Sequence, residues 1–178
     1  GYGAALLRVG REQEALANLL RAAELAPPRP ETLFDLGMAA TRLGKWSEAK
    51  VALDKLVEVR PETKEAYKLL GKACYELRHF DGALSAYREA LTLEPGLVEA
   101  HAAVGMILVD KGRDAEAIAS LERACAARAE DGPLYDAWEE LLDVLDRTMR
   151  RAGPGKMAEL EGRIEAPRAG DMGEKLKL

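Results

Sequence analysis

The 178-residue sequence is poor in several features that define large classes of proteins. It contains two cysteines and two histidines, and these do not have the spacing of a zinc site or of a framework of several disulfides. Aromatic residues make up only 5% of the chain, and few stretches show the alternation of β-branched and polar residues that is typical of strands. No apolar run reaches the roughly 18 residues that a membrane-spanning helix needs. The sequence therefore predicts neither a sheet, nor a metal centre, nor a membrane span.

The two cysteines, Cys74 and Cys125, each fall in an apolar helical segment. We expect small buried thiols, with a disulfide between them as the weaker alternative. Buried thiols and the lack of a visible signal peptide favour a cytoplasmic protein. The chain begins with Gly1 instead of Met, so an N-terminal signal or a larger domain ahead of these residues stays an alternative.

A broad excess of basic charge is also missing. The net charge is −5, and residues 1–146 hold 18 Lys and Arg against 26 Asp and Glu. Residues 147–178 hold 8 against 5, which is only mildly basic and mixed in sign. Binding to a phosphate backbone needs clustered positive charge. We therefore expect no nucleic-acid partner.

The sequence does contain a clear internal repeat with a step of 34 residues. One series consists of glycines, at Gly3, Gly37, Gly71 and Gly105. A second marks a turn, which is slightly altered in its third copy, at Gly10, Gly44, His79 and Gly112. Further series are Ala15, Ala49, Ala83 and Ala117; Leu19, Leu53, Tyr87 and Leu121; and Pro27, Pro61 and Pro95. Coincident series at one period of this size indicate stacked supersecondary units.

Each unit reads as a helical hairpin. The first helix is expected to end near the glycine of the Gly44 type, where the chain turns. The second begins at WSEAK or FDGAL, with Ser47 and Asp81 placed to cap it, and ends before Pro61 or Pro95. The small residues of the glycine and alanine series allow the two helices of one hairpin to approach closely.

These positions resemble the tetratricopeptide repeat (TPR). The copy at 64–97 matches the family pattern at Tyr67, Leu70, Gly71, Ala83, Tyr87, Ala90 and Pro95 and departs from it at Cys74, where the family has an aromatic residue. The resemblance covers residues 1–131. It implies an all-α fold, a right-handed superhelix of antiparallel helical hairpins, with a partial repeat at 1–29 and full repeats at 30–63, 64–97 and 98–131.

After the repeats, residues 132–150 are predicted to form a C-terminal capping helix. Their apolar residues recur at helical spacing and the opposite face is acidic, and Glu139 stands where the next small residue of the series is due. Residues 151–178 contain clusters of Gly and Pro, which indicate a linker and a flexible tail. The tail either stays disordered or forms a short helix that docks on this array or on another one.

The resemblance implies that the first helices line a concave surface. At the positions that line this surface in the family, the sequence has apolar, basic and aromatic residues. Such residues fit a peptide with hydrophobic anchors and an acidic group. The candidate site residues are Phe34, Met38, Arg42, Lys68, Lys72, Tyr75, Met106 and Val109. The alternatives are that these residues are scattered surface positions, or that they contact the tail or another copy of the chain.

These observations predict a non-catalytic protein–protein interaction scaffold or adaptor, with no cofactor and no metal. The motifs HExxH and GxSxG, a phosphate loop and paired Cys/His ligands are all absent from the sequence. His101 takes a core-facing position and His79 a turn, which leaves little acid–base machinery. The alternatives are a regulatory or targeting segment of a larger protein, which the lack of an initial Met suggests, and a self-association module.

Overall fold

The structure, a computed structural model, describes residues 2–25 and 27–126. Every regular element in this part of the chain is an α-helix. The helices are α1 (Tyr2–Arg8), α2 (Glu12–Leu25), α3 (Pro30–Arg42), α4 (Trp46–Val59), α5 (Lys64–Glu76), α6 (Phe80–Leu93), α7 (Val98–Asp110) and α8 (Asp114–Ala126). The predicted all-α fold is confirmed, whereas the predicted capping helix at 132–150 and the tail at 151–178 lie outside the described residues.

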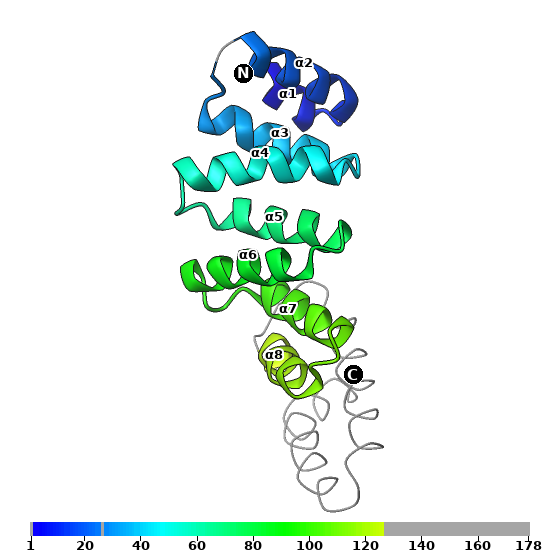
Figure 1. Ribbon diagram of the computed structural model, residues 1–178. Helices are drawn as coiled ribbons and strands as arrows, with labels where there is room; N and C mark the ends of the chain where they lie inside the picture. The colour runs from blue at the N-terminus through cyan, green and yellow to red at the C-terminus, as the bar shows by residue number, and fades with distance from the viewer. Residues whose placement is uncertain (1, 26, 127–178) are drawn as a thin grey trace, which may run out of the picture. The chain divides into compact units, whose positions relative to one another are not determined.

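The chain forms two compact units, residues 1–100 and residues 101–178. In the first unit, helices α1 to α6 stack in chain order (Figure 1). Each helix contacts the next one, and α1 also contacts α3, as α3 contacts α5. Successive first helices of the hairpins therefore touch one another directly. In the second unit, the described part of the chain comprises most of α7 and the whole of α8.

Proline and glycine set the helix boundaries. Helix α3 carries Pro30 in its first turn, where the missing N–H costs nothing. Helices α4 and α6 end two residues before Pro61 and Pro95, as expected from the restricted backbone that precedes a proline. The predicted caps are wrong. Ser47 and Asp81 lie inside the first turns of α4 and α6, one residue after the helix has begun.

The turn inside each hairpin requires a left-handed residue. Gly10, Gly44 and Gly112 have φ angles of +72°, +68° and +69°. In the third hairpin the equivalent residue is Arg78, with φ of +62°, and not His79, which directly precedes α6. The predicted turn residue of the third hairpin, His79, is therefore wrong by one position. A left-handed conformation costs an L-residue roughly 1–2 kcal/mol, so the third turn is strained where the others are not.

The close approach of the two helices of a hairpin depends on the glycine series. A Cβ atom built on Gly71 would lie 2.8 Å from two atoms of the Tyr87 ring, and one built on Gly37 would lie 2.7 Å from Leu53. Both distances are shorter than non-bonded carbons tolerate. Glycine is thus needed for the spacing of α3 on α4 and of α5 on α6.

The rest of the core is made of small and branched apolar residues. The alanine series is fully buried, with 0% exposure at Ala15, Ala49, Ala83 and Ala117. Cys74 is a free thiol with 2% exposure, which confirms the expectation of a small buried residue, and burial raises its pKa. The side chain of Cys125 is outside the described residues.

Candidate protein-binding surface

Helices α3 and α5, which contact each other directly in the first unit, carry a set of side chains that are not fully buried. We call this the first-helix surface and define it by Phe34, Met38, Lys68, Lys72 and Tyr75. Phe34, Met38, Lys68 and Tyr75 are half-buried, and Lys72 is exposed. Thus the structure brings five of the eight predicted site residues onto neighbouring helices.

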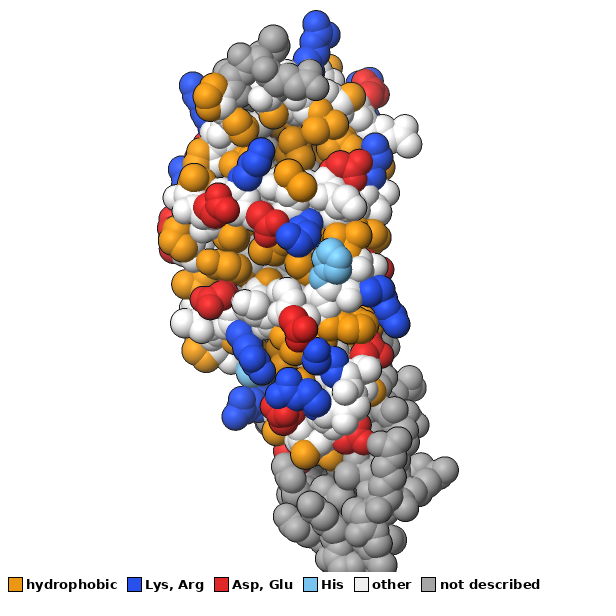
Figure 2. All heavy atoms as spheres, viewed as in Figure 1, with side chains coloured by type: hydrophobic (Ala, Val, Ile, Leu, Met, Phe, Trp, Pro, Cys, Tyr) orange, Lys and Arg blue, Asp and Glu red, His pale blue; other side chains and the backbone are white. Residues whose placement is uncertain are grey.

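The two lysines lie one step of 34 residues after the two apolar residues, Lys68 after Phe34 and Lys72 after Met38. Each lysine therefore occupies on α5 the helix position that an apolar side chain occupies on α3. Figure 2 shows the face of the molecule seen in Figure 1, on which apolar side chains are interspersed with charges of both signs over the first unit. Contacts with a protein partner combine these two kinds of groups.

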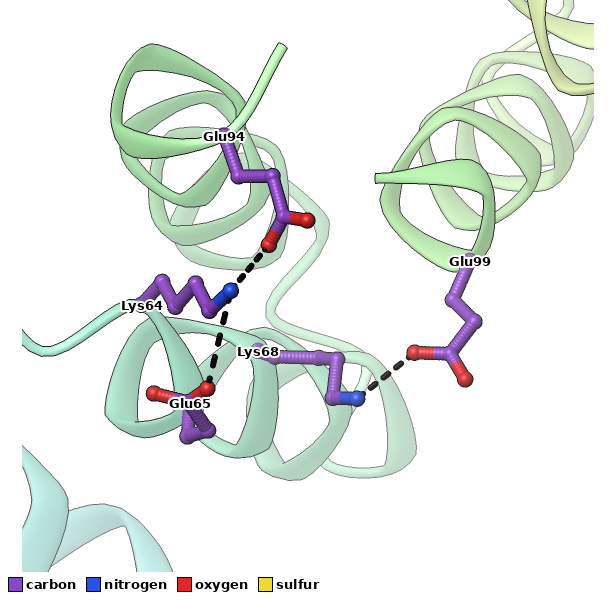
Figure 3. A network of polar contacts seen from close by, with 5 residues as sticks. All are labelled: Lys64, Glu65, Lys68, Glu94 and Glu99. Atoms are coloured by element: carbon purple, nitrogen blue, oxygen red, sulfur yellow. Dashed lines mark hydrogen bonds and ion pairs between the residues drawn. The ribbon is translucent and has the colours of Figure 1, made fainter. Parts of the chain in front are cut away.

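Lys68 is held by an ion pair inside the first unit. Its Nζ donates a hydrogen bond to Oε2 of Glu99, at 2.6 Å. One turn earlier on α5, Lys64 bonds the carboxylate of Glu94 and lies near that of Glu65 (Figure 3). The charge of Lys68 is thus already matched by a carboxylate.

Lys72 is placed differently. Its Nζ lies 6.0 Å from the centroid of the Trp46 ring, at the outer limit of a cation–π interaction. Among the described residues, no carboxylate forms an ion pair with it. Nearby on the same helix, the Tyr75 ring packs against that of Phe80, with the centroids 5.8 Å apart. Lys72 is therefore an exposed cation beside an aromatic ring and without a counter-charge on the described part of the chain.

Arg42 serves to join hairpins. Its Nη1 donates a hydrogen bond to the carbonyl oxygen of Leu7 at 3.1 Å and lies 3.5 Å from Oε1 of Glu12. These contacts connect α3 to both helices of the first hairpin. Binding a partner through Arg42 would compete with them.

Met106 and Val109 lie on α7 in the second unit, and both are half-buried. His101, on the same helix, is half-buried, and His79 is exposed in the turn before α6. In the part of the chain that the structure describes, no group of three or more His, Cys, Asp or Glu is arranged to hold a metal ion. No described helix is both long enough and apolar enough to cross a membrane.

Two side chains that contact predicted site residues were missed by sequence reasoning, namely Trp46 beside Lys72 and Glu12 beside Arg42. Trp46 begins the second helix of a hairpin, and the periodic pattern marks it only as a start signal. Glu99 belongs to the next repeat. Its pairing with Lys68 depends on how far two side chains reach between helices, which no periodicity contains.

The family model of the tetratricopeptide repeat matches residues 34–98 and 75–133. Together the two matches extend over more than half of the chain. The chain belongs to the tetratricopeptide repeat family. Proteins of this family generally serve as non-enzymatic protein–protein interaction scaffolds, and membership of it supports a protein partner here.

Solved structures show the same fold. A crystal structure of MamA has 20% sequence identity and a TM-score of 0.79 over 95% of this chain and 94% of that chain. MamA from Desulfovibrio magneticus RS-1 has 22% identity and a TM-score of 0.74 over 96% and 93%. TTC0263, a thermophilic TPR protein from Thermus thermophilus, has 25% identity and a TM-score of 0.59 over 94% and 96%. A search of curated protein sequences gives no significant match.

Proposed function

We propose that this TPR protein is a non-catalytic scaffold that holds an acidic, partly apolar peptide segment of a protein partner on the first-helix surface. The observation that carries the proposal is the state of Lys72. It is exposed, it lies beside Trp46, and it has no ion pair with a described residue, whereas Lys68 and Arg42 are already bonded within the first unit.

The chemistry of the surface favours a carboxylate next to an apolar group. A hydrogen bond from an ammonium group to a carboxylate is about twice as strong as one between neutral groups. One hairpin away, Phe34 and Met38 offer a half-buried apolar area, and the flexible thioether of Met adapts to different side chains. A segment that places an acidic residue on α5 and an apolar residue on α3 uses both features.

On the second unit, taken by itself, Met106 and Val109 are the proposed binding residues. Their equivalence to Lys72 and Tyr75, one repeat step earlier, supports this part of the proposal. Arg42 is a weaker member, because it would first have to leave Leu7 and Glu12.

The proposal is tested by titrating the protein with synthetic peptides of about ten residues that carry Asp and Leu, against peptides in which Lys replaces each Asp. A Trp138→Phe background leaves Trp46 as the single tryptophan, because the sequence has two. Binding of the acidic peptide next to Lys72 is expected to change the Trp46 emission, and the basic peptide is expected to have no effect.

The variants are Lys72→Gln, Lys68→Gln and, as a matched control, Lys55→Gln. Lys55 is an exposed lysine on α4, a second helix. An ion pair with an exposed lysine contributes at most about 1 kcal/mol, so Lys72→Gln should weaken the binding of the acidic peptide up to about fivefold. Lys55→Gln should change the affinity less than about twofold, since an exposed charge away from the site contributes little. Equal losses for Lys72→Gln and Lys55→Gln would refute the proposed site.

A further inference from the structure

Two equivalent aromatic residues begin the second helices of the second and third hairpins. Trp46 is the first residue of α4 and Phe80 is the first residue of α6, and the two are one step of 34 residues apart. Both rings are half-buried. The turns of these two hairpins lie at the same edge of the first unit (Figure 1). Each hairpin therefore has an aromatic ring at that edge.

A cation lies over each of these two rings. Nζ of Lys72 is 6.0 Å from the centroid of the Trp46 ring, and Cζ of Arg78 is 5.0 Å from the centroid of the Phe80 ring. Both distances are within the range of a cation–π interaction. Lys72 comes from the hairpin that follows Trp46, whereas Arg78 belongs to the turn directly before α6. The first unit thus makes the same arrangement twice, from different parts of the sequence.

Arg78 occupies its place in spite of a backbone cost. The aligned residues of the other three hairpins are Gly10, Gly44 and Gly112, and Arg78 adopts the same left-handed conformation, with φ of +62°. Strained residues of this kind are concentrated at functional sites such as ligand clamps. A glycine here would remove the strain and, with it, the guanidinium group. The presence of an arginine at this position therefore points to a role for its side chain.

Neither Lys72 nor Arg78 has a carboxylate partner on the described chain. Both side chains are exposed, and neither forms an ion pair with a described residue. Arg11, in the turn of the first hairpin, differs from them because it bonds the carboxylate of Glu14. A guanidinium group that lies over a ring can still donate two parallel hydrogen bonds from its edge to one carboxylate. Arg78 is thus a second cation that can receive an acidic group.

The ring of Tyr75 lies between the two cations. Tyr75 follows Lys72 by three residues on α5, and residues with this spacing are neighbours on a helix surface. Its ring centroid is 5.8 Å from that of Phe80, the ring under Arg78. Helix α5 contacts both α4 and α6, so these side chains cross from α4 to α6 over the end of α5. We call them the turn-edge strip, which consists of Trp46, Lys72, Tyr75, Arg78 and Phe80.

We propose that the turn-edge strip extends the site at Lys72, and that the partner segment carries two acidic residues, one bound by Lys72 and the other by Arg78. This inference rests on the proposed function, because it takes binding at Lys72 as given. The apolar residue of the segment lies on α3, and α6 lies on the other side of α5 from α3 (Figure 1). The segment therefore carries its groups in the order apolar, acidic, acidic.

The test uses the full chain with the Trp138→Phe change and three kinds of peptide of about ten residues. The first carries Leu and one Asp. The second has a further Asp, placed two, three or four residues beyond the first Asp on the side away from Leu. The third has the further Asp at the same distances on the other side of Leu. The last two have the same composition and charge, so they differ only in the order of their groups.

Binding is measured from the emission of Trp46. The peptide with the order apolar, acidic, acidic is expected to bind about threefold to fivefold more tightly than the single-Asp peptide at one of the three spacings, which is the upper range for an exposed ion pair. The peptide with Leu between the two Asp residues should bind within about 1.5-fold of the single-Asp peptide, because general attraction is screened beyond about 8 Å at physiological ionic strength.

Variants of Arg78 identify the second cation. Arg78→Gln keeps a non-glycine residue at the left-handed position, so the backbone strain stays, and it should remove the gain from the second Asp. Arg78→Lys keeps the charge without the planar guanidinium group, and the gain should be smaller than with arginine. Arg88→Gln is the matched control, because Arg88 is an exposed arginine on α6 outside the strip, and it should leave the gain unchanged.

The proposal is overturned if the two doubly acidic peptides bind equally, or if the gain from the second Asp persists in Arg78→Gln. An equal gain in Arg78→Lys would overturn the paired hydrogen bonds from the guanidinium group. If the single-Asp peptide binds through Lys72 and the second Asp adds nothing, this inference alone fails. If the single-Asp peptide does not bind, or binds equally well to Lys72→Gln, the proposed function fails and this inference fails with it.

Discussion

Substitution of Gly71 by Ala tests the packing of α5 on α6 most directly. Alanine favours a helix over glycine by about 1 kcal/mol, so without a steric conflict the change would stabilise α5. The new Cβ atom, however, would lie 2.8 Å from the ring of Tyr87, and that ring is 6% exposed. Overpacking of this kind costs typically about 1–3 kcal/mol. We expect Gly71→Ala to lower the free energy of unfolding by about 1 kcal/mol.

Gly82→Ala is the matched control, because Gly82 is also helical and belongs to the same hairpin. It is exposed in the first turn of α6, and the nearest atom to its Cβ would be Sγ of Cys74 at 3.4 Å, which is an ordinary contact. This change should therefore keep the propensity gain and stabilise the protein by up to about 1 kcal/mol. The same substitution of Gly by Ala is thus expected to lower the free energy of unfolding at one position and to raise it at the other.

Thermal and urea unfolding, followed by circular dichroism, measure the difference. For a chain of this size, 1 kcal/mol shifts the Tm by roughly 2–4 °C, so the two variants should differ by about 4–8 °C. Equal Tm values for Gly71→Ala and Gly82→Ala would refute the argument that α5 and α6 need a glycine at their crossing.

Three further outcomes follow from particular side chains. Burial raises the pKa of the Tyr87 hydroxyl. The stability that this hydroxyl contributes is therefore complete below the usual tyrosine pKa of about 10 and is lost as the pH rises above it. Tyr87→Phe should shift the midpoint of alkaline unfolding to higher pH, and an unchanged midpoint would contradict this. At the left-handed position of the third turn, Arg78→Gly should be more stable to urea than Arg78→Ala by about 1 kcal/mol, since only glycine adopts this φ without cost. Glu99→Gln breaks an ion pair whose side chains are 37% and 51% exposed. Urea unfolding should therefore show a decrease of less than about 0.5 kcal/mol in the free energy of unfolding. A decrease of more than about 1 kcal/mol would show that the pair is better shielded from solvent.

The fold could be predicted from the sequence because the residues that determine helix packing occur at equivalent positions in several repeats. The glycine series predicted where two helices cross, and the structure places Gly37 against Leu53 and Gly71 against Tyr87. The proline series predicted where the second helices end. In both cases the same chemical requirement recurs in successive repeats. Glycine leaves space for the neighbouring helix, and proline lacks the N–H that a continuing helix needs. Because the pattern recurs at a fixed step, it is not a chance coincidence.

The errors arose where the determining interaction is specific to one copy. The left-handed conformation of Arg78 has no glycine to mark it, and Ser47 and Asp81 resemble caps although the helices begin one residue earlier. The ion pairs of Lys68 and Arg42 depend on contacts between residues of different repeats. A period of 34 shows which residues are equivalent, but it does not show which charges lie within reach of one another.

The contacts of the first unit have a consequence for how this protein folds. Helices α1 to α6 contact mainly the helices next to them in the chain, and the main further contacts, of α1 with α3 and of α3 with α5, skip a single helix. Chains with such short sequence separations between contacts close small loops and fold fast. Stability in such an array is close to a sum of hairpin and neighbour terms, so amide hydrogen exchange should vary along it. Helices that pack against a neighbour on each side, such as α4 between α3 and α5, should exchange last.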